Sequence, residues 1–212
     1  MKPRHERERE FRREYIIEAT ENLLKEKTFE AITMDDIALA AGFAKASIYQ
    51  YFNNKEELLI GVFLKAVKTE CQLIEERCLP QADPVQALRN YLMLEFELIH
   101  WYSWILKVIR TVTLKDFTEN SLLHERDRKK ELIAEIIRQG QAKGVFIIGD
   151  TEVLTNMILT VSEGFALYYT GMAVFFTTDN TTDNTTDNTK KPEIEMFIST
   201  MMKGISRENK ND

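Results

Sequence analysis

The chain has 212 residues, which is enough to bury a hydrophobic core without the help of disulfides or structural metals. It contains only 4 Pro and 8 Gly, and this shortage of turn residues argues against a sandwich or barrel of many short strands and favours long helices. The formal net charge of −6, taken as a whole, argues against a nucleic-acid-binding protein.

Other classes are disfavoured by simple features of the sequence. The two cysteines, Cys71 and Cys78, form no CxxC motif, so we expect reduced thiols rather than a disulfide framework. Residues 1–13 are charged, unlike a secretory signal, and the longest apolar run, 164–176, is too short to cross a bilayer. We therefore expect a soluble, cytoplasmic protein with no membrane partner.

The N-terminal end predicts a long helix. Over residues 8–27, apolar side chains recur at four-residue steps, which is typical of an amphipathic helix: Phe11, Tyr15, Ala19 and Leu23. Residues 1–13 carry six basic and three acidic side chains, so this end has a local charge of +3 despite the acidic total. The sum over the whole chain therefore hides an uneven distribution of charge.

Two short helices are expected next. Thr33 and Asp36 have the spacing of an N-cap and an N3 acid, a relative of the capping box. Gly42 stands where the left-handed residue after a helix is expected. The second short helix runs from about 44 to 51, and residues 54–57 begin a long helix.

The rest of the chain is also helical in pattern. Asp83 and Pro84 suit the N-cap and first position of a helix, which we expect to continue to about residue 99. A separate helix is expected to carry the aromatic cluster 100–104, and further helices are predicted over about 120–142, 150–176 and 192–205. The last one bears a full apolar stripe: Ile194, Phe197, Ile198, Met201, Met202 and Ile205.

Residues 177–188 are three copies of Thr-Thr-Asp-Asn, without a single apolar residue. A polar, low-complexity tract cannot bury enough apolar surface to offset the entropy cost of ordering it. We therefore predict a disordered loop over 177–190.

Residues 33–59 carry the sequence motif that points to a function. Two short helices joined by a tight turn at Gly42 match the helix-turn-helix pattern. At about 100° per residue from Ile48, which we expect to be buried, the outward face and its flanks are uncharged: Ala46, Ser47, Tyr49 and Gln50. Such side chains suit the base edges of a DNA major groove.

Charges around this face support the same interpretation. Lys45 and Lys55 bracket it, and no acid occurs between Gly42 and Asn54. Thr33, at a helix N-terminus, has a hydroxyl and nearby backbone N–H groups that suit a phosphate. From these residues alone, a pair of short helices in an ordinary α-helical bundle is the alternative.

The full motif reads Thr33-x3-Ile37-Ala38-x2-Ala41-Gly42-Phe43-Ala44-Lys45-Ala46-Ser47-Ile48-Tyr49-Gln50-Tyr51-Phe52-x2-Lys55-Glu56-x-Leu58-Leu59. It resembles the DNA-binding signature of the TetR family of bacterial transcriptional regulators, over about a quarter of the chain. Phe43 and Ala44 depart from the commonest form, which has Val and Ser. Loss of the serine hydroxyl weakens one expected helix cap.

The resemblance implies an all-α fold, with a helix-turn-helix DNA-binding domain at 1–57 and a larger helical ligand-binding and dimerisation domain at 58–212. It also implies site roles in three groups. The recognition helix would carry Ser47, Tyr49 and Gln50, beside the outward-facing Ala46. Phosphates would be contacted by Lys45, Tyr51 and Lys55, while Thr33 would cap the preceding helix against the DNA backbone.

The resemblance further implies a homodimeric repressor that binds a pseudo-palindromic double-stranded DNA operator and is released by a small-molecule inducer. We expect the helix ending near Phe176 and the stripe Ile194–Ile205 to pair with their symmetry mates. The alternatives are a regulator controlled by a protein partner, and a helical ligand carrier or enzyme.

An inducer pocket is predicted from aromatic and polar side chains of two helices: Glu95, Phe96, His100, Trp101, Trp104, Tyr168, Tyr169 and Met172. Aromatic faces with a buried carboxylate would suit a flat or cationic ligand, and ordinary core packing is the alternative. The three histidines lack metal-ligand spacing, and no catalytic motif is evident, so we expect no metal, no cofactor and no enzyme activity. The charged run 126–131 is interpreted as a solvated helix face.

Overall fold

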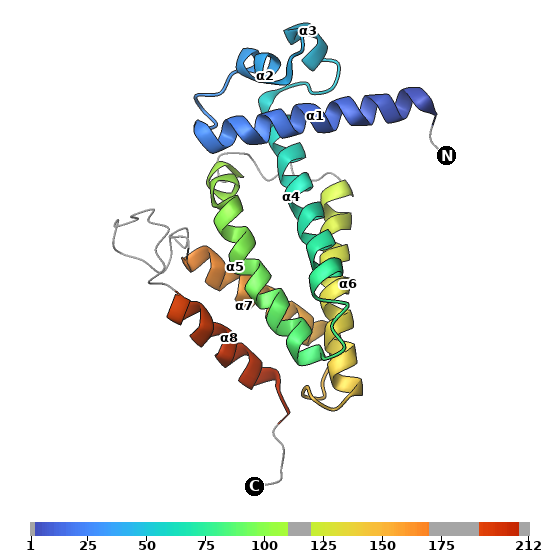
Figure 1. The fold of residues 1–212 in the computed structure, drawn as a ribbon, viewed down its shortest axis with the longest axis vertical. Coiled ribbons are helices and arrows are strands. Elements are labelled where there is room, and N and C mark those ends of the chain that lie inside the picture. Colours follow the sequence, from blue (N-terminus) through green and yellow to red (C-terminus); the bar gives the residue numbers. More distant parts are fainter. Residues whose placement is uncertain (1–2, 110–119, 170–190, 208–212) are drawn as a thin grey trace. The chain divides into compact units, whose positions relative to one another are not determined.

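The computed structural model describes residues 3–109, 120–169 and 191–207, and within these ranges the chain forms eight α-helices and no strand (Figure 1). The helices are α1 (Arg4–Glu26), α2 (Met34–Ala41), α3 (Lys45–Ile48), α4 (Lys55–Arg77), α5 (Pro84–Ile109), α6 (Asn120–Ala142), α7 (Thr151–Tyr169) and α8 (Lys191–Ile205). The predicted all-α fold is confirmed. None of the described helices is long and apolar enough to span a membrane.

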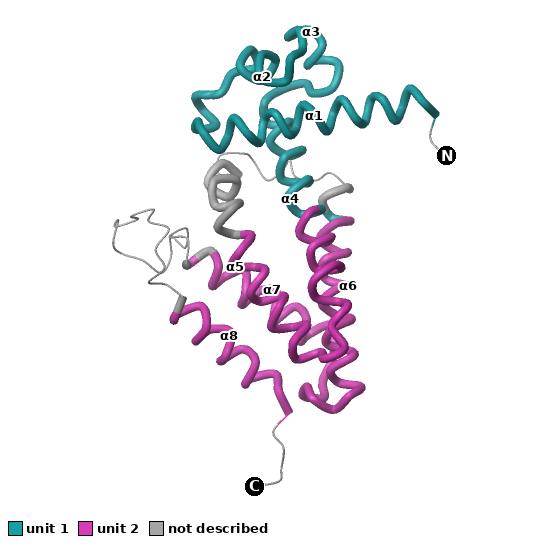
Figure 2. Tube along the Cα trace, in the orientation of Figure 1, with its two compact units in different colours: residues 1–68, 104–123 teal, residues 69–103, 124–212 magenta. Residues whose placement is uncertain are grey.

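The chain divides into two compact units, shown in different colours in Figure 2. The first comprises residues 1–68 and 104–123, and the second comprises residues 69–103 and 124–212. Helix α4 begins in the first unit and ends in the second. The predicted disordered loop, 177–190, lies outside the described residues.

In the first unit, α1 packs on α2 and α2 packs on α3. The predicted apolar face of α1 is wrong in its phase, since Phe11 and Tyr15 are 68% and 48% exposed. The buried face is instead made by Ile16, Ile17, Thr20 and Leu24. A row of residues four apart turns by about 40° per step around a helix, so it cannot follow a straight contact over several turns.

The core of the second unit draws side chains from α4, α5, α6, α7 and α8. Asp83 begins α5 as predicted, because its carboxylate accepts a hydrogen bond from the N–H of Val85 at 3.0 Å. The helix then runs without a break to Ile109, so the prediction of a separate helix for residues 100–104 is wrong. No Pro or Gly occurs between residues 85 and 109 to end the helix earlier.

The apolar stripe of α8 packs against the core of its own unit. Ile198, Met202 and Ile205 are buried there, and Ile194, Phe197 and Met201 are partly buried against the same core. For the three buried residues the predicted pairing with a second chain is therefore wrong, and for the partly buried ones it stays a prediction. A helix pattern shows that one face is apolar, but not which surface covers it.

Candidate nucleic-acid interface

Helix α2 is closed at its start by a capping box. The Thr33 hydroxyl accepts a hydrogen bond from the N–H of Asp36 at 3.2 Å, and the Asp36 carboxylate accepts one from the N–H of Thr33 at 2.9 Å. The same hydroxyl donates to that carboxylate, which with the backbone bond and nearby Lys27 lowers the pKa of Asp36 to about 2. The predicted cap is confirmed, and the Thr33 hydroxyl is already engaged within the chain.

The turn between α2 and α3 depends on Gly42. Its φ of 67° lies in the left-handed region, and its N–H is directed at the carbonyls of Ala38 and Leu39. The following Phe43 N–H bonds the Ala38 carbonyl at 2.9 Å, which closes the end of α2. The buried methyl group of Ala38 leaves room for the next helix to approach closely.

Helix α3 is shorter than the sequence predicts. Regular helix covers only Lys45–Ile48, after which the N–H of Gln50 bonds Ser47 and the N–H of Tyr51 bonds Ile48 across three residues rather than four. These bonds tighten the last turn, as is usual at helix ends. At its start, Ala44 supplies no side-chain cap, in line with the missing serine hydroxyl.

One face of α3 and the turn after it is solvent-exposed. Ile48 is fully buried, and Ala46, Tyr49 and Gln50 are exposed, while Ser47 is half-buried. The arrangement agrees with the angular count from Ile48. It presents amide, hydroxyl and methyl groups directly after the capped helix α2, and such groups can read base edges.

The two predicted phosphate lysines have different surroundings. Lys45 forms an exposed ion pair with Asp35 at 2.7 Å. The Lys55 ammonium is half-buried, donates to the carbonyls of Phe29 at 2.7 Å and Ile32 at 2.9 Å, and lies 4.3 Å from the Phe29 ring centroid. Two of its three N–H groups therefore hold the connection before α2 against the start of α4.

Arg13 is a functional candidate that sequence reasoning missed. Its guanidinium lies 4.3 Å from the ring centroid of Phe52 and donates to the Tyr51 carbonyl at 3.0 Å. It also lies 3.6 Å from a carboxylate oxygen of Glu57. Arg13 thus ties α1 to the turn that follows α3. Only its place in the basic stretch 1–13 could have singled it out.

The predicted inducer pocket is described only in part. Phe96 is buried and makes edge contacts with the rings of Phe165 and Phe197, both at 5.6 Å, while Tyr168 is partly exposed. The side chains of the other predicted aromatic and polar residues lie outside the described part of the structure: His100, Trp101, Trp104, Tyr169 and Met172.

Glu95, the predicted carboxylate of that pocket, belongs to a buried ion cluster. The Lys129 ammonium lies 2.7 Å from Glu95 and 2.6 Å from Glu70, with Glu163 at 3.3 Å. Lys129 is buried, so the interpretation of residues 126–131 as a wholly solvated face is wrong at this position. A charge count cannot reveal such burial, because Glu70 and Glu95 come from other helices.

The titration of this cluster is strongly coupled. Burial, together with the charge of Glu95, raises the pKa of Glu70 to about 8. Burial also acts to raise the pKa of Glu95, but the charge of Lys129 and hydrogen bonds from Glu70, Lys129 and Tyr91 outweigh it and lower that pKa. The surroundings of the shared Lys129 ammonium therefore shift the pKa values of the two carboxyls in opposite directions, upward for Glu70 and downward for Glu95.

Comparison with known proteins agrees with the geometry of the first unit. Residues 16–62 match the sequence profile of bacterial regulatory proteins of the tetR family. The crystal structure of the TetR-family transcriptional regulator PfmR from Thermus thermophilus is 25% identical and superposes with a TM-score of 0.61, over 91% of this chain and 99% of that one. Residues 16–62 therefore resemble the DNA-binding segment of the TetR family, and the whole chain shares the fold of a solved TetR-family regulator.

Two further relatives extend the comparison. YhgD of Bacillus subtilis (strain 168), described as an uncharacterized HTH-type transcriptional regulator, is 32% identical over 113 residues. That alignment covers 52% of this chain and 53% of YhgD, so it spans about half the length of each protein. A TetR transcription regulator from Haloarcula marismortui ATCC 43049 shares the fold, with a TM-score of 0.69 at 18% identity over 93% of this chain and all of that one.

Proposed function

We propose that this protein is a DNA-binding transcriptional regulator of the TetR family, with residues 1–57 as its DNA-binding domain and 58–212 as its regulatory and dimerisation domain. The observation that carries the proposal is the exposed, uncharged face formed by Ala46, Tyr49 and Gln50 on a helix-turn-helix whose first helix is capped. Gln50 would pair with a base edge, while Lys45, Tyr51 and the remaining N–H of Lys55 would contact phosphates.

In this proposal the protein acts as a homodimer in the cytoplasm. Supporting this, α7 exposes apolar side chains along one side, and a second copy could cover them: Val153, Met157, Val161 and Tyr168. Gly164 stands within the same stretch, and a Cβ there would meet nothing within 4 Å, so another helix could approach closely. Two recognition elements would then enter successive major grooves of a pseudo-palindromic operator.

In the same proposal the protein is a repressor, and a small-molecule inducer releases it from the operator. The aromatic cluster around Phe96 and the neighbouring ion cluster of Glu95 and Lys129 offer apolar contact area together with fixed polar groups. An inducer would act by preferring a conformation in which the two DNA-binding domains no longer match the half-sites.

The test is selection of DNA fragments from the source genome on the purified protein. We expect recovered fragments to share an inverted repeat whose half-sites lie about 10 base pairs apart. Gln50→Ala should relax sequence preference at one position by roughly 1–3 kcal/mol, whereas Arg138→Gln, on an exposed face of α6, should leave it unchanged. Recovery of no shared sequence, or an equal loss on all sequences with Gln50→Ala, contradicts the proposal.

A further inference from the structure

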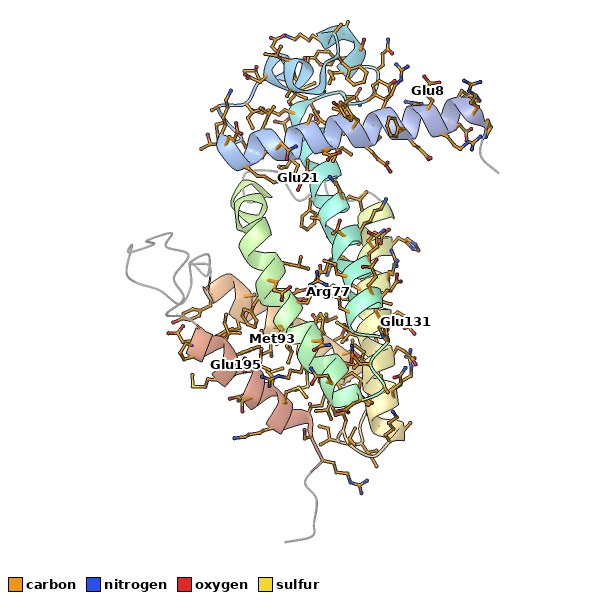
Figure 3. The ribbon with its side chains drawn as sticks, in the orientation of Figure 1. Glu8, Glu21, Arg77, Met93, Glu131 and Glu195 are labelled. Atoms are coloured by element: carbon orange, nitrogen blue, oxygen red, sulfur yellow. The ribbon has the colours of Figure 1, made fainter. Side chains whose placement is uncertain are left out.

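A groove of about 340 Å³ lies beside the end of α3. One wall is a single face of α1, whose contributing residues are spaced i, i+3, i+4 and i+7, and the other wall is the turn after α3. The lining residues are His5, Glu8, Arg9, Arg12, Gln50 and Tyr51. Figure 3 labels Glu8 on this part of α1. The groove therefore shares Gln50 with the proposed base-reading face.

The α1 wall is an extension that packing does not explain. The segment that matches the family begins at residue 16, so the first twelve residues of α1 precede it. Residues 3–12 are all exposed, and they contribute nothing to the hydrophobic core. Residues 4–13 carry five arginines against three glutamates, an excess of positive charge in a chain whose total is −6.

Arg13 fixes α1, which forms one wall of the groove, against the turn after α3. This side chain bonds the Tyr51 carbonyl and stacks on Phe52, so the adjacent Arg12 and Arg9, one turn earlier, keep their place beside Gln50. A surface that contacted DNA through Gln50 would therefore also bring Arg9 and Arg12 to the DNA. Side chains three apart on a helix are about 5–6 Å apart at Cβ, within reach of neighbouring phosphates on one strand.

We propose that this groove receives the sugar-phosphate backbone of duplex DNA at the edge of the major groove that α3 enters, with Arg9 and Arg12 contacting phosphates. The inference rests on the proposed function of α3 and adds contacts that the helix-turn-helix itself does not supply. Arginine suits this role because its planar fork donates two parallel hydrogen bonds to a phosphate.

Glu8 modulates this contact. It pairs with Arg12 at 2.7 Å, and both side chains are about half exposed. Exposed pairs of this kind contribute little free energy, so a phosphate can replace the carboxylate. Glu8 thereby competes with DNA for Arg12 and limits attachment to arbitrary sequences.

The experiment measures the affinity of the full chain for a labelled duplex of mixed sequence, about 30 base pairs long, as a function of salt. For Arg9→Gln/Arg12→Gln we expect the slope of log K against log salt to fall by about 1.8 in magnitude, or about 0.9 per arginine. Glu8→Gln should tighten binding. The matched control is Arg138→Gln, which removes an arginine from an equally exposed helix-face pair and should leave the slope unchanged.

The outcomes separate this inference from the proposed function. If the wild-type protein shows no salt-dependent binding, both fail. If Lys45→Ala reduces the slope while the double arginine variant does not, the helix-turn-helix contacts stand and the groove contact is overturned. That second result would also be the one expected if the groove served an acidic protein partner.

Discussion

The Lys129 ammonium lies 2.7 Å from the Glu95 carboxylate, and both side chains are buried in the second unit. Tyr91 completes the surroundings, with its ring centroid 5.9 Å from the same ammonium. A buried ion pair contributes little net free energy relative to apolar packing, because desolvation offsets the attraction. Its loss is nevertheless costly, since the remaining partner stays buried without compensation.

Lys129→Met should therefore destabilise the protein by about 3–5 kcal/mol, because Glu95 would be left as a buried charge without its cation. The free energy of unfolding from urea titration checks this. Lys130→Met is the matched control, since its pair with Glu152 is largely exposed, and we expect a change within about 0.5 kcal/mol. Equal effects of the two variants would contradict the importance of the buried pair.

Stability should also depend on pH through Glu70. Its pKa of about 8 in the folded state exceeds the value near 4.3 expected in the unfolded chain, so folding favours the protonated form. The contribution is fully present below about pH 4 and is lost as pH rises through 8. Glu70→Gln, which mimics the protonated carboxyl, should flatten the fall in unfolding free energy between about pH 5 and 8. An unchanged pH profile would show that Glu70 is ionised in the folded protein.

Lys55 should affect both stability and DNA binding. Lys55→Ala removes two hydrogen bonds to the carbonyls of Phe29 and Ile32, and we expect a loss of about 1–3 kcal/mol in unfolding free energy. The salt slope of DNA binding should fall by about one if the third N–H reaches a phosphate. Lys45→Ala, from an exposed pair with Asp35, should change the slope without that loss of stability. Lost stability with an unchanged slope would restrict Lys55 to its internal role.

Gly140 should tolerate no side chain. A Cβ at this position would overlap the ring of Phe146, which is fully buried. Gly140→Ala should lower the unfolding free energy by about 1–3 kcal/mol despite the better helix propensity of alanine. Gly204→Ala, where a Cβ meets nothing within 4 Å, should leave it unchanged or raise it. Thermal unfolding of the two variants distinguishes close packing from simple propensity.

The proposed dimer depends on the outward face of α7. Met157 is 57% exposed in the single chain, so Met157→Glu should not disturb folding but should place a charge in the proposed interface. We expect this variant to be monomeric by sedimentation at concentrations where the wild type is dimeric. Ile148→Glu, at an exposed apolar position outside α7, is the control and should stay dimeric. A dimeric Met157→Glu protein would place the interface elsewhere.

Local features of the fold were predictable because their partners are close in sequence. Thr33 and Asp36 bond one another three residues apart, and Gly42 takes its left-handed backbone directly after α2. The exposure of Gln50 follows from the burial of Ile48 by helical geometry alone. These are the same features that carry the candidate DNA-binding site.

Other features depended on partners from distant helices. The phase of α1 was missed because its buried face depends on a distant partner, since Ile17 lies against Gly61 of α4. The internal bonds of Lys55 were missed for the same reason, since Phe29 and Ile32 lie more than twenty residues earlier. Charge and spacing place such a side chain near DNA without revealing what else it binds.

By itself, the amino-acid sequence determined the helical class, the helix-turn-helix and the residues of its outward face, because these rest on periodicity and on hydrogen bonds within a few residues. Only the tertiary structure decided that Lys129 is buried between Glu70 and Glu95, that the apolar stripe of α8 covers its own core, and that the basic extension of α1 faces Gln50. Burial and pairing are properties of several helices together, and a pattern along one helix cannot specify which neighbour it meets.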